Sequence, residues 1–190
     1  MSMGRLVVQL RTSQGISLVE LLMAMAIIAI LLQTILPSLH ELSANQRHIT
    51  QVNQLIGHLH LARSEALKRR SWVVMCKSAD GEFCSSQGDW QQGWILFQDD
   101  NRNRSREADE PLIYHYPGNS SLRVRHRGYP AYSSNRYVVY YPDGSSLGNG
   151  TFTICDPRGY AAPRAVIMAR SGRVRADMVA ADGSALNCDG

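Results

Sequence analysis

The sequence lacks the short motifs that mark the common enzyme classes. It has no GxSxG, HExxH, GxGxxG or P-loop pattern, and its acidic residues are scattered at expected turns. It also has no CxxC pair, which argues against a structural zinc site. Internal repeats and low-complexity segments are absent as well. We therefore expect a protein that is not an enzyme and that needs no cofactor and no metal.

One long apolar run is present near the N-terminus. Residues 16–37 are almost entirely apolar, and a helix of about 20 such residues spans the hydrocarbon core of a bilayer, which is roughly 30 Å thick. The preceding residues 1–15 carry two arginines and no acid, which places them in the cytoplasm by the positive-inside rule. The sequence thus predicts a single membrane span with the remaining residues on the periplasmic side.

Glu20 lies inside this apolar run. An acid that faces lipid costs about 2.5 to 3.5 kcal/mol and normally has a partner. A short stretch of small and polar residues ends at Gly15, before the apolar run, so cleavage there would leave the helix on the mature chain. The new amine of Ile16 would then be the partner of Glu20, in the same helix or on a neighbouring subunit.

Gly15, the apolar run, Glu20 five residues into the mature chain and Pro37 together resemble the class III signal of type IV prepilins and type II secretion pseudopilins. The resemblance implies cleavage after Gly15 by a prepilin peptidase, methylation of the Ile16 amine, and packing of the helix into a filament core with Glu20 aligning each incoming subunit. Ile16 departs from the usual Phe of the family, an apolar residue replacing another. The alternative is an ordinary signal anchor.

Beyond Pro37 the apolar residues recur at steps of three, four and seven, which predicts an amphipathic helix over residues 38–70. We expect its buried face to hold Leu42, Ile49, Val52, Ile56, Leu59 and Ala66. Pro37 is expected to bend the helix, because a proline removes one backbone hydrogen bond. Three cations at residues 68–70 predict its end.

Residues 71–190 are predicted to form a β-rich periplasmic head. Eight short β-rich runs, from WVVMC to GRVRA, are separated by Gly, Pro, Asn and Asp. Eight runs in about 105 residues favour an antiparallel sandwich or two packed sheets. The predicted class is α+β, a type IV pilin-like fold with a long N-terminal helix, membrane half plus amphipathic half, packed on an antiparallel β-sandwich.

Three segments of the head resemble the GspH/FimT family of minor pilins and pseudopilins: LARSEALKRRSWVVMC, CSSQGDWQQGWILFQDDN and TFTICDPRGYAAPRAVIMARSGRVRA. Residues 101–150 match the family poorly. The resemblance implies a small complex at a filament tip that primes or caps assembly. It also implies partners, namely other minor and major pilins and the inner-membrane assembly platform. Both a FimT/FimU-like pilus protein and a GspH-like secretion pseudopilin remain open.

All four cysteines lie in the part of the chain expected outside the cytoplasm, where an even count favours disulfides. Four cysteines allow three pairings, which the sequence alone does not distinguish. We favour Cys76 with Cys84 and Cys155 with Cys188, because each bond joins neighbours in the sequence.

Gly172-Arg173-Val174-Arg175 matches the GRxR motif of FimT-type pilins, where the motif is associated with binding DNA during natural transformation. In a strand, Arg173 and Arg175 would share one face, about 7 Å apart, and each could engage a phosphate of double-stranded DNA. Gly172 would let the backbone approach. Possible additions are Arg123, Arg125, Arg127, Arg158, Arg164 and Arg170. The alternative is that abundant arginine reflects a GC-rich genome or an ordinary polar strand face.

Two further groups of residues have weaker signals. Asp99, Asn101, Asn103, Ser105, Glu107 and Glu110 occupy the ligand offsets of a calcium loop. The position that should be Gly is Arg104, which favours a solvated charged hairpin tip. His58 and His60 are two apart on a predicted helix and face different ways, so we expect ordinary surface residues there.

Overall fold

The computed structural model describes residues 17–129 and 135–188, with the side chains of 34–41 and 129 excepted. Gly15 and Ile16, the expected cleavage and methylation positions, lie outside the described residues. The chain divides into two compact units, Met1–Leu39 and His40–Gly190. Each unit is described by itself.

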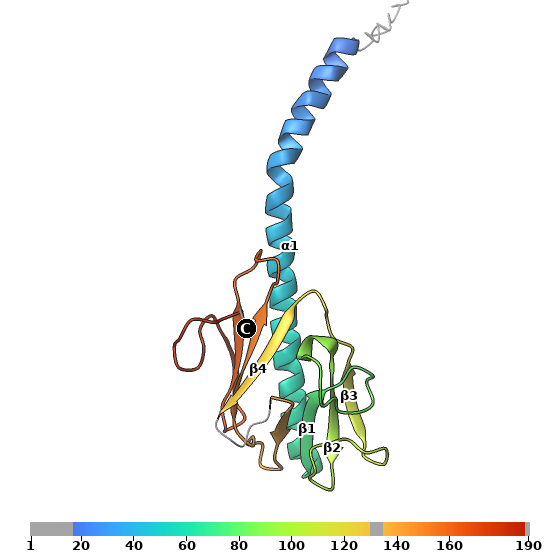
Figure 1. Ribbon diagram of the computed structural model, residues 1–190, viewed down its shortest axis with the longest axis vertical. Coiled ribbons are helices and arrows are strands. Elements are labelled where there is room, and N and C mark those ends of the chain that lie inside the picture. Colours follow the sequence, from blue (N-terminus) through green and yellow to red (C-terminus); the bar gives the residue numbers. More distant parts are fainter. Residues whose placement is uncertain (1–16, 130–134, 189–190) are drawn as a thin grey trace, which may run out of the picture. The chain divides into compact units, whose positions relative to one another are not determined.

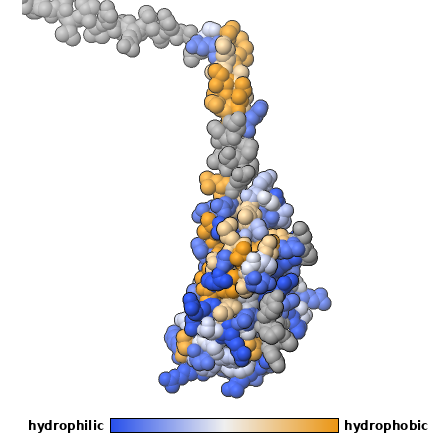
Figure 2. Space-filling model, turned by 90° about the vertical axis from the view of Figure 1, so that its left-hand side faces the viewer, coloured by the Kyte–Doolittle hydropathy of each residue, from blue (hydrophilic) through white to orange (hydrophobic). Residues whose placement is uncertain are grey.

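Helix α1 (Leu18–Arg69) supplies the described part of the first unit. Its backbone begins with a hydrogen bond from the Glu20 amide to the Ser17 hydroxyl, 3.4 Å long. Between residues 18 and 32 the large apolar side chains are about half or more exposed, and Figure 2 shows these turns as almost uniformly hydrophobic. Within the described residues, no helix meets the length and mean hydropathy required of a membrane-spanning segment.

In the second unit α1 buries one face. The buried positions follow the helical spacing of three and four residues: Ala44, His48, Gln51, Val52, Leu55, Leu59, Ala62 and Ala66. Leu42, expected on this face, is instead 65% exposed, and Ile49 and Ile56 lie at its margin. The helix ends at Arg69, as the run of cations predicted, and Arg70 follows with a φ of 52°.

The head contains two antiparallel four-stranded sheets (Figure 1). Sheet A has the order β3 (Leu112–Tyr116), β2 (Trp94–Asp99), β1 (Trp72–Lys77) and β5 (Tyr137–Tyr140). Sheet B has the order β4 (Arg123–Tyr129), β6 (Asn149–Cys155), β7 (Arg164–Met168) and β8 (Val174–Asp177). A short 3₁₀ helix, η1 (Trp90–Gln92), precedes β2. Each of the eight predicted runs overlaps one strand, so the α+β prediction is confirmed.

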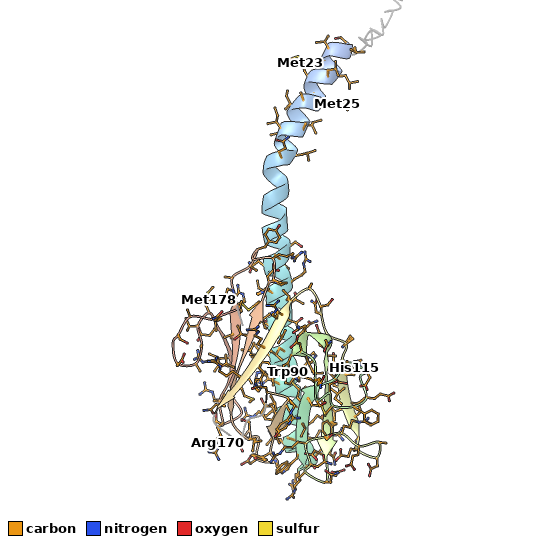
Figure 3. All side chains as sticks on the ribbon, in the orientation of Figure 1. Met23, Met25, Trp90, His115, Arg170 and Met178 are labelled. Carbon is orange, nitrogen blue, oxygen red and sulfur yellow. A yellow bond between two sulfur atoms is a disulfide. The ribbon has the colours of Figure 1, made fainter. Side chains whose placement is uncertain are left out.

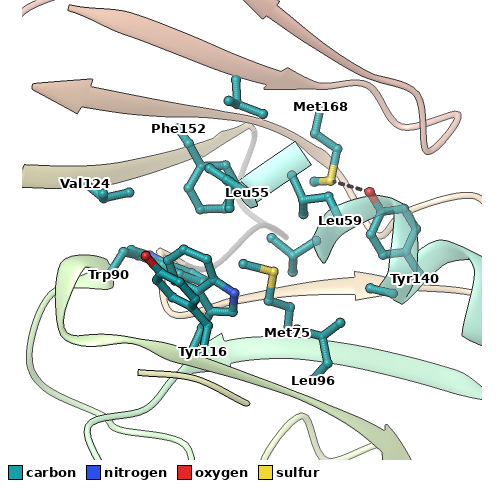
Figure 4. Packing of buried hydrophobic residues seen from close by; sticks show 14 of the residues in the cluster. Leu55, Leu59, Met75, Trp90, Leu96, Tyr116, Val124, Tyr140, Phe152 and Met168 are labelled. Atoms are coloured by element: carbon teal, nitrogen blue, oxygen red, sulfur yellow. Dashed lines mark hydrogen bonds between the residues drawn. The ribbon is translucent and has the colours of Figure 1, made fainter. Parts of the chain in front are cut away.

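One hydrophobic core joins α1 to both sheets. Leu55 and Leu59 of the helix pack between side chains of the two sheets (Figure 4). The sheet residues drawn there include Met75 and Leu96 from sheet A, and Val124, Phe152 and Met168 from sheet B. The Tyr140 hydroxyl of sheet A is 3.4 Å from the Met168 sulfur of sheet B. The inner face of each sheet is therefore the face that contacts this core.

Sheet A also buries its opposite face. Val74, Cys76, Ile95, Phe97 and Val139 form a second hydrophobic cluster there. Partly buried side chains from the flanking loops and strand ends cover it: Trp72, Cys84, Tyr137, Tyr141 and Leu147. Strands β1, β2 and β5 are therefore apolar and buried on both faces, which agrees with the continuous apolar runs of β1 and β2, whereas Leu112 and His115 of β3 are exposed.

Arg63 of α1 ties the two sheets together at one point. Its Nε donates to the Gly144 carbonyl at 2.9 Å, just beyond β5 of sheet A. Its Nη2 donates to the Ser171 carbonyl at 3.3 Å, in the β7–β8 turn of sheet B. The guanidinium fork thus satisfies carbonyls from both sheets with one side chain, as the planar geometry of arginine allows.

Candidate functional site

The face of sheet B that points away from the core, called here the outer face, carries arginines at both edges. On β4, Val124 and His126 are buried, so the alternate residues Arg123, Arg125 and Arg127 point outward. Across the sheet, Arg127 is in register with Thr151, then Ile167, then Arg175. Three strand spacings separate β4 from β8, about 14 Å. The outer face thus brings together the two arginine groups that were singled out from the sequence.

The GRxR segment lies at the β8 edge. Arg173 and Arg175 are exposed, and Val174 between them packs against the core, which is the alternation expected of a strand. Arg175 forms an ion pair with Asp177, two residues along the same face. Arg173 has no ion pair among the described residues. Of the two motif arginines, Arg173 is therefore the one whose charge is not already offset.

Gly172 serves the fold. It is buried, its φ is +78°, and a side chain on it would overlap the Gly144 carbonyl oxygen. Only glycine adopts this conformation without strain and also allows the two backbones to meet. The close neighbour of Gly172 is thus the loop after β5, and a phosphate contact at Gly172 stays a prediction.

The other arginines divide into two groups. Arg170 is exposed in the β7–β8 turn, its amide donates to Asn149 Oδ1 at 2.6 Å, and Figure 3 shows it at the end of sheet B opposite to Met178. Arg164 belongs to the inner side, since its register partner Ile154 is buried in the core, and it donates to Asn45 of α1. Arg158 pairs with Asp156 at 3.3 Å. Neither Arg158 nor Arg164 joins the outer face.

The C-terminal segment forms a hairpin beside the outer face. Val179 bridges to Ala185, and the Ala180 amide donates to the Ser184 carbonyl at 2.9 Å. Asp182 at its tip accepts hydrogen bonds from Ser184, and these bonds, together with the nearby Arg127, lower the pKa of the Asp182 carboxyl. The hairpin therefore reaches from β8 back toward β4.

A groove of about 760 Å³ lies between this hairpin and the sheet. Its lining combines two arginines and one carboxylate with polar, small and apolar side chains: Arg125, Arg127, Asp182, His126, Asn149, Thr151, Thr153, Ser184, Asn187, Ala181, Met168 and Leu186 among them. No sequence pattern indicated this groove, because its two walls are about 30 residues apart in the chain. Only the disulfide near its end could have suggested that the tail folds back.

Two disulfides fix these loops. Cys76 bonds to Cys84 and Cys155 bonds to Cys188, with Cα–Cα distances of 5.6 and 5.9 Å. This is the pairing favoured from the sequence. The first bond holds the loop after β1 against the second hydrophobic cluster, and the second attaches the C-terminal hairpin to the end of β6.

In the charged loop after β2, two carboxylates accept hydrogen bonds from backbone amides of the same loop. Asp99 accepts hydrogen bonds from the Asn103 and Arg104 amides at 3.1 Å, and burial raises the pKa of this carboxyl. Glu110 accepts from the Asp100 and Glu107 amides at 3.0 Å. Both acids are buried, so the expected solvated tip is wrong for them. Among the described residues no three metal-ligating side chains come together.

Two histidines of α1 face the head. Trp94 Nε1 donates to His58 Nδ1 at 3.3 Å, and the His58 ring lies 4.5 Å from that of Tyr114. His48 is fully buried near Cys155 and Asp156. Burial lowers the pKa of both imidazoles. The expectation that His58 is an ordinary surface residue is therefore wrong, whereas His60 is exposed.

Comparison with known sequences identifies relatives. Residues 51–172 match the family described as type II transport protein GspH, and residues 10–32 match the prokaryotic N-terminal methylation motif. The pilin-like protein PilA1 of Thermus thermophilus is 28% identical over 166 residues, which cover 86% of this chain and 98% of that protein.

Solved structures have a similar fold. The type IV minor pilin FimU of Pseudomonas aeruginosa is similar with a TM-score of 0.50 and 18% identity, over 70% of this chain and 90% of FimU. The minor pseudopilin EpsH of the Vibrio cholerae type 2 secretion system is similar with a TM-score of 0.45 and 12% identity, over 67% of this chain and 93% of EpsH. The GspH match alone covers more than half of the sequence. The chain therefore belongs to the GspH family of pilin-like and pseudopilin proteins, envelope-associated structural components that assemble with other pilins and are not enzymes.

Proposed function

We propose that this protein is a minor pilin of a type IV pilus, of the FimT/FimU type, which primes or caps filament assembly. In this proposal a prepilin peptidase cleaves after Gly15, Ile16 becomes N-methylated, and residues 16–37 cross the inner membrane once before they enter the filament. The head, residues 71–190, faces the periplasm. The assembly platform and neighbouring major and minor pilins are the partners.

The observation that carries this proposal is the exposed apolar surface of α1. Between residues 18 and 32 eleven large apolar side chains are about half or more exposed: Leu18, Val19, Leu21, Leu22, Met23, Met25, Ile27, Ile28, Ile30, Leu31 and Leu32. A soluble monomer rarely exposes a continuous apolar patch above a few hundred Å². Lipid before assembly, and helices of other subunits after it, would cover this surface.

Glu20 is the residue to test. Its side chain is exposed among these apolar residues, and the amine that would pair with it lies on Ile16. In the filament, the carboxylate would be buried, so an unpaired charge there would be costly. We expect Glu20→Ala to be cleaved normally after Gly15 but to be lost from purified pili, whereas Ser17→Ala should be incorporated as the native chain is.

Deletion of the gene distinguishes a pilus from the alternative, a GspH-like pseudopilin of a type II secretion system. Loss of surface pili, counted by electron microscopy and restored by the native gene, is expected for a minor pilin. Normal piliation with secreted proteins retained in the periplasm would contradict the pilus proposal and support the pseudopilin.

DNA binding is a second candidate function, favoured by the arginines on the outer face of sheet B. Arg173 and Arg175 at one edge and Arg123, Arg125 and Arg127 at the other all point to the same side. Phosphate contacts by such groups are insensitive to base sequence and weaken with salt. Gly172 and Arg170 would only shape the β7–β8 turn beside them.

The test uses the full chain in non-ionic detergent with labelled DNA. Binding should weaken steeply with added salt, and Arg173→Gln should weaken it more than Arg175→Gln, because Arg175 is paired with Asp177. The matched change Asp177→Asn removes that pairing and should strengthen binding. If all three variants bind DNA with the affinity of the native chain, the β8 edge is not the DNA site.

A further inference from the structure

We propose that the groove between the outer face of sheet B and the C-terminal hairpin holds one extended phosphodiester strand. The ligand class is single-stranded rather than duplex DNA. This inference rests on the proposed DNA binding and names the form of nucleic acid that the groove takes. Four features of the groove support it, and each concerns residues that the structure describes.

The first feature is an unpaired cation. Arg125 is half-buried in the groove, and its side chain has neither a hydrogen-bond partner nor an ion pair among the described residues. Its guanidinium nitrogens are not buried, so an anionic ligand can reach them and accept charge-assisted hydrogen bonds. Arg127, two residues along β4, already faces Asp182. Arg125 is therefore the main anchor.

The second feature is the neutral lining. Thr151 and Thr153 of β6, with Asn149 and Asn187 at the sides, offer hydroxyl and amide donors next to Arg125. Such side chains, together with arginine, are those that contact phosphate oxygens in nucleic-acid complexes. Asp182 is the single carboxylate among the lining residues that are described. The lining thus suits an anion with several acceptor oxygens.

The third feature is the absence of Trp, Tyr and Phe rings from the described lining of the groove. No Trp, Tyr or Phe side chain is among the described residues that form the groove. Proteins that grip bases in single strands stack them on such aromatic rings. Contacts here would be made to the backbone, so we expect little preference among base sequences.

The fourth feature is the size of the groove and its roof. The hairpin is joined to the end of β6 by Cys155–Cys188, and the groove volume of about 760 Å³ is within the roughly 300 to 1,000 Å³ of small-ligand sites. A duplex carries two strands wound around each other, so it would have to displace the hairpin to lay one backbone against Arg125, Thr151 and Thr153. An extended peptide usually pairs with a free strand edge, but the floor of this groove is the paired β4–β6 ladder.

The experiment compares an oligothymidylate with a duplex of equal length on the full chain in non-ionic detergent, by fluorescence anisotropy between about 50 and 200 mM salt. The oligothymidylate should bind more tightly. Arg125→Gln should lower its affinity about tenfold, as expected for one charged hydrogen-bonded contact. The same change should reduce the salt slope by about 0.7, the value for one phosphate of a single strand.

Two variants are controls. Arg47→Gln removes an exposed arginine of α1 that lies outside the groove lining and should leave single-strand affinity within twofold of the native value, roughly the scatter of distant surface changes. Cys155→Ser with Cys188→Ser releases the hairpin and should lower single-strand affinity without lowering duplex affinity. An unchanged near-ultraviolet spectrum in Arg125→Gln would show that the head remains folded.

The outcomes separate this inference from the function on which it rests. Tighter binding of the duplex, lost in Arg173→Gln and kept in Arg125→Gln, would overturn the groove and leave DNA binding in place. Binding of neither DNA would overturn both. Tighter, Arg125-dependent binding of polyglutamate would overturn the groove proposal in favour of an acidic polypeptide.

Discussion

Sheets A and B pack their inner faces against the same helix core but differ on the opposite face. The opposite face of sheet A is a second hydrophobic cluster around Val74, Ile95 and Phe97. The outer face of sheet B carries arginine and threonine and borders a groove. The strands of sheet A that are apolar on both sides, β1, β2 and β5, have no face left for a ligand. Sheet A is therefore mainly structural, and the arginines carried by the described strands lie on sheet B.

The largest expected effect comes from the second cluster of sheet A. Phe97 is fully buried there, and Phe97→Ala should lower the free energy of unfolding by about 3 to 5 kcal/mol. The counterpart on the outer face of sheet B is Arg123→Gln, which should change the free energy of unfolding by less than about 0.5 kcal/mol. Urea unfolding followed by tryptophan fluorescence measures both. Equal losses would mean that the two faces do not differ in role.

The next largest effect is expected from the two disulfides, one beside each sheet. Cys76 and Cys84, beside sheet A, have a sequence separation of 8, and Cys155 and Cys188, beside sheet B, have one of 33. Chain entropy alone assigns about 2.6 and about 3.8 kcal/mol to these loops. Double Ser variants, compared by thermal unfolding, should follow that order. The reverse order would show that the cluster packed around Cys76 outweighs loop length.

A substitution at Gly172, where loops of the two sheets meet, should have a smaller effect on stability. Gly172→Ala forces a side chain into the Gly144 carbonyl at a positive φ, which should cost more than the roughly 1 kcal/mol of an unfavourable glycine replacement. Gly183 has a similar φ of +81° but no neighbour within 4 Å, so Gly183→Ala isolates the conformational part. If both variants melt at the same temperature, the contact between Gly172 and Gly144 is not tight in solution.

The smallest effect is a dependence on pH. Burial holds the pKa of His48, beside sheet B, and of His58, beside sheet A, below the usual 6.5. The unfolded chain therefore binds more protons, so stability is full above pH 6.5 and is lost as the pH falls through the folded values. The melting temperature should fall between about pH 7 and 5.

Separate His48→Gln and His58→Gln variants show which histidine, the one beside sheet B or the one beside sheet A, causes the dependence of stability on pH. Each should reduce the slope of melting temperature against pH, and His58→Gln keeps an acceptor for Trp94 Nε1. A slope that neither substitution changes would attribute the effect to other groups.

Local patterns predicted much of the fold. The strands could be predicted because each short run is bounded by turn residues, and the helix end because of three consecutive cations. The burial of Leu42 was predicted wrongly, since periodicity gives a face but not where the head begins to cover it. The GRxR segment showed which side Arg173 and Arg175 share. It did not reveal the Asp177 partner of Arg175 or the Gly144 neighbour of Gly172, because strand register and loop contacts are set by the tertiary structure.

The contact made by Arg63 has a mechanical consequence. Its guanidinium hydrogen-bonds carbonyls that lie 81 and 108 residues away, one beyond each of two different sheets. A tensile load carried along α1 is therefore transferred to both sheets at the same side chain and is shared between them. A lysine at this position, a single point donor, could not hold both carbonyls in the same way.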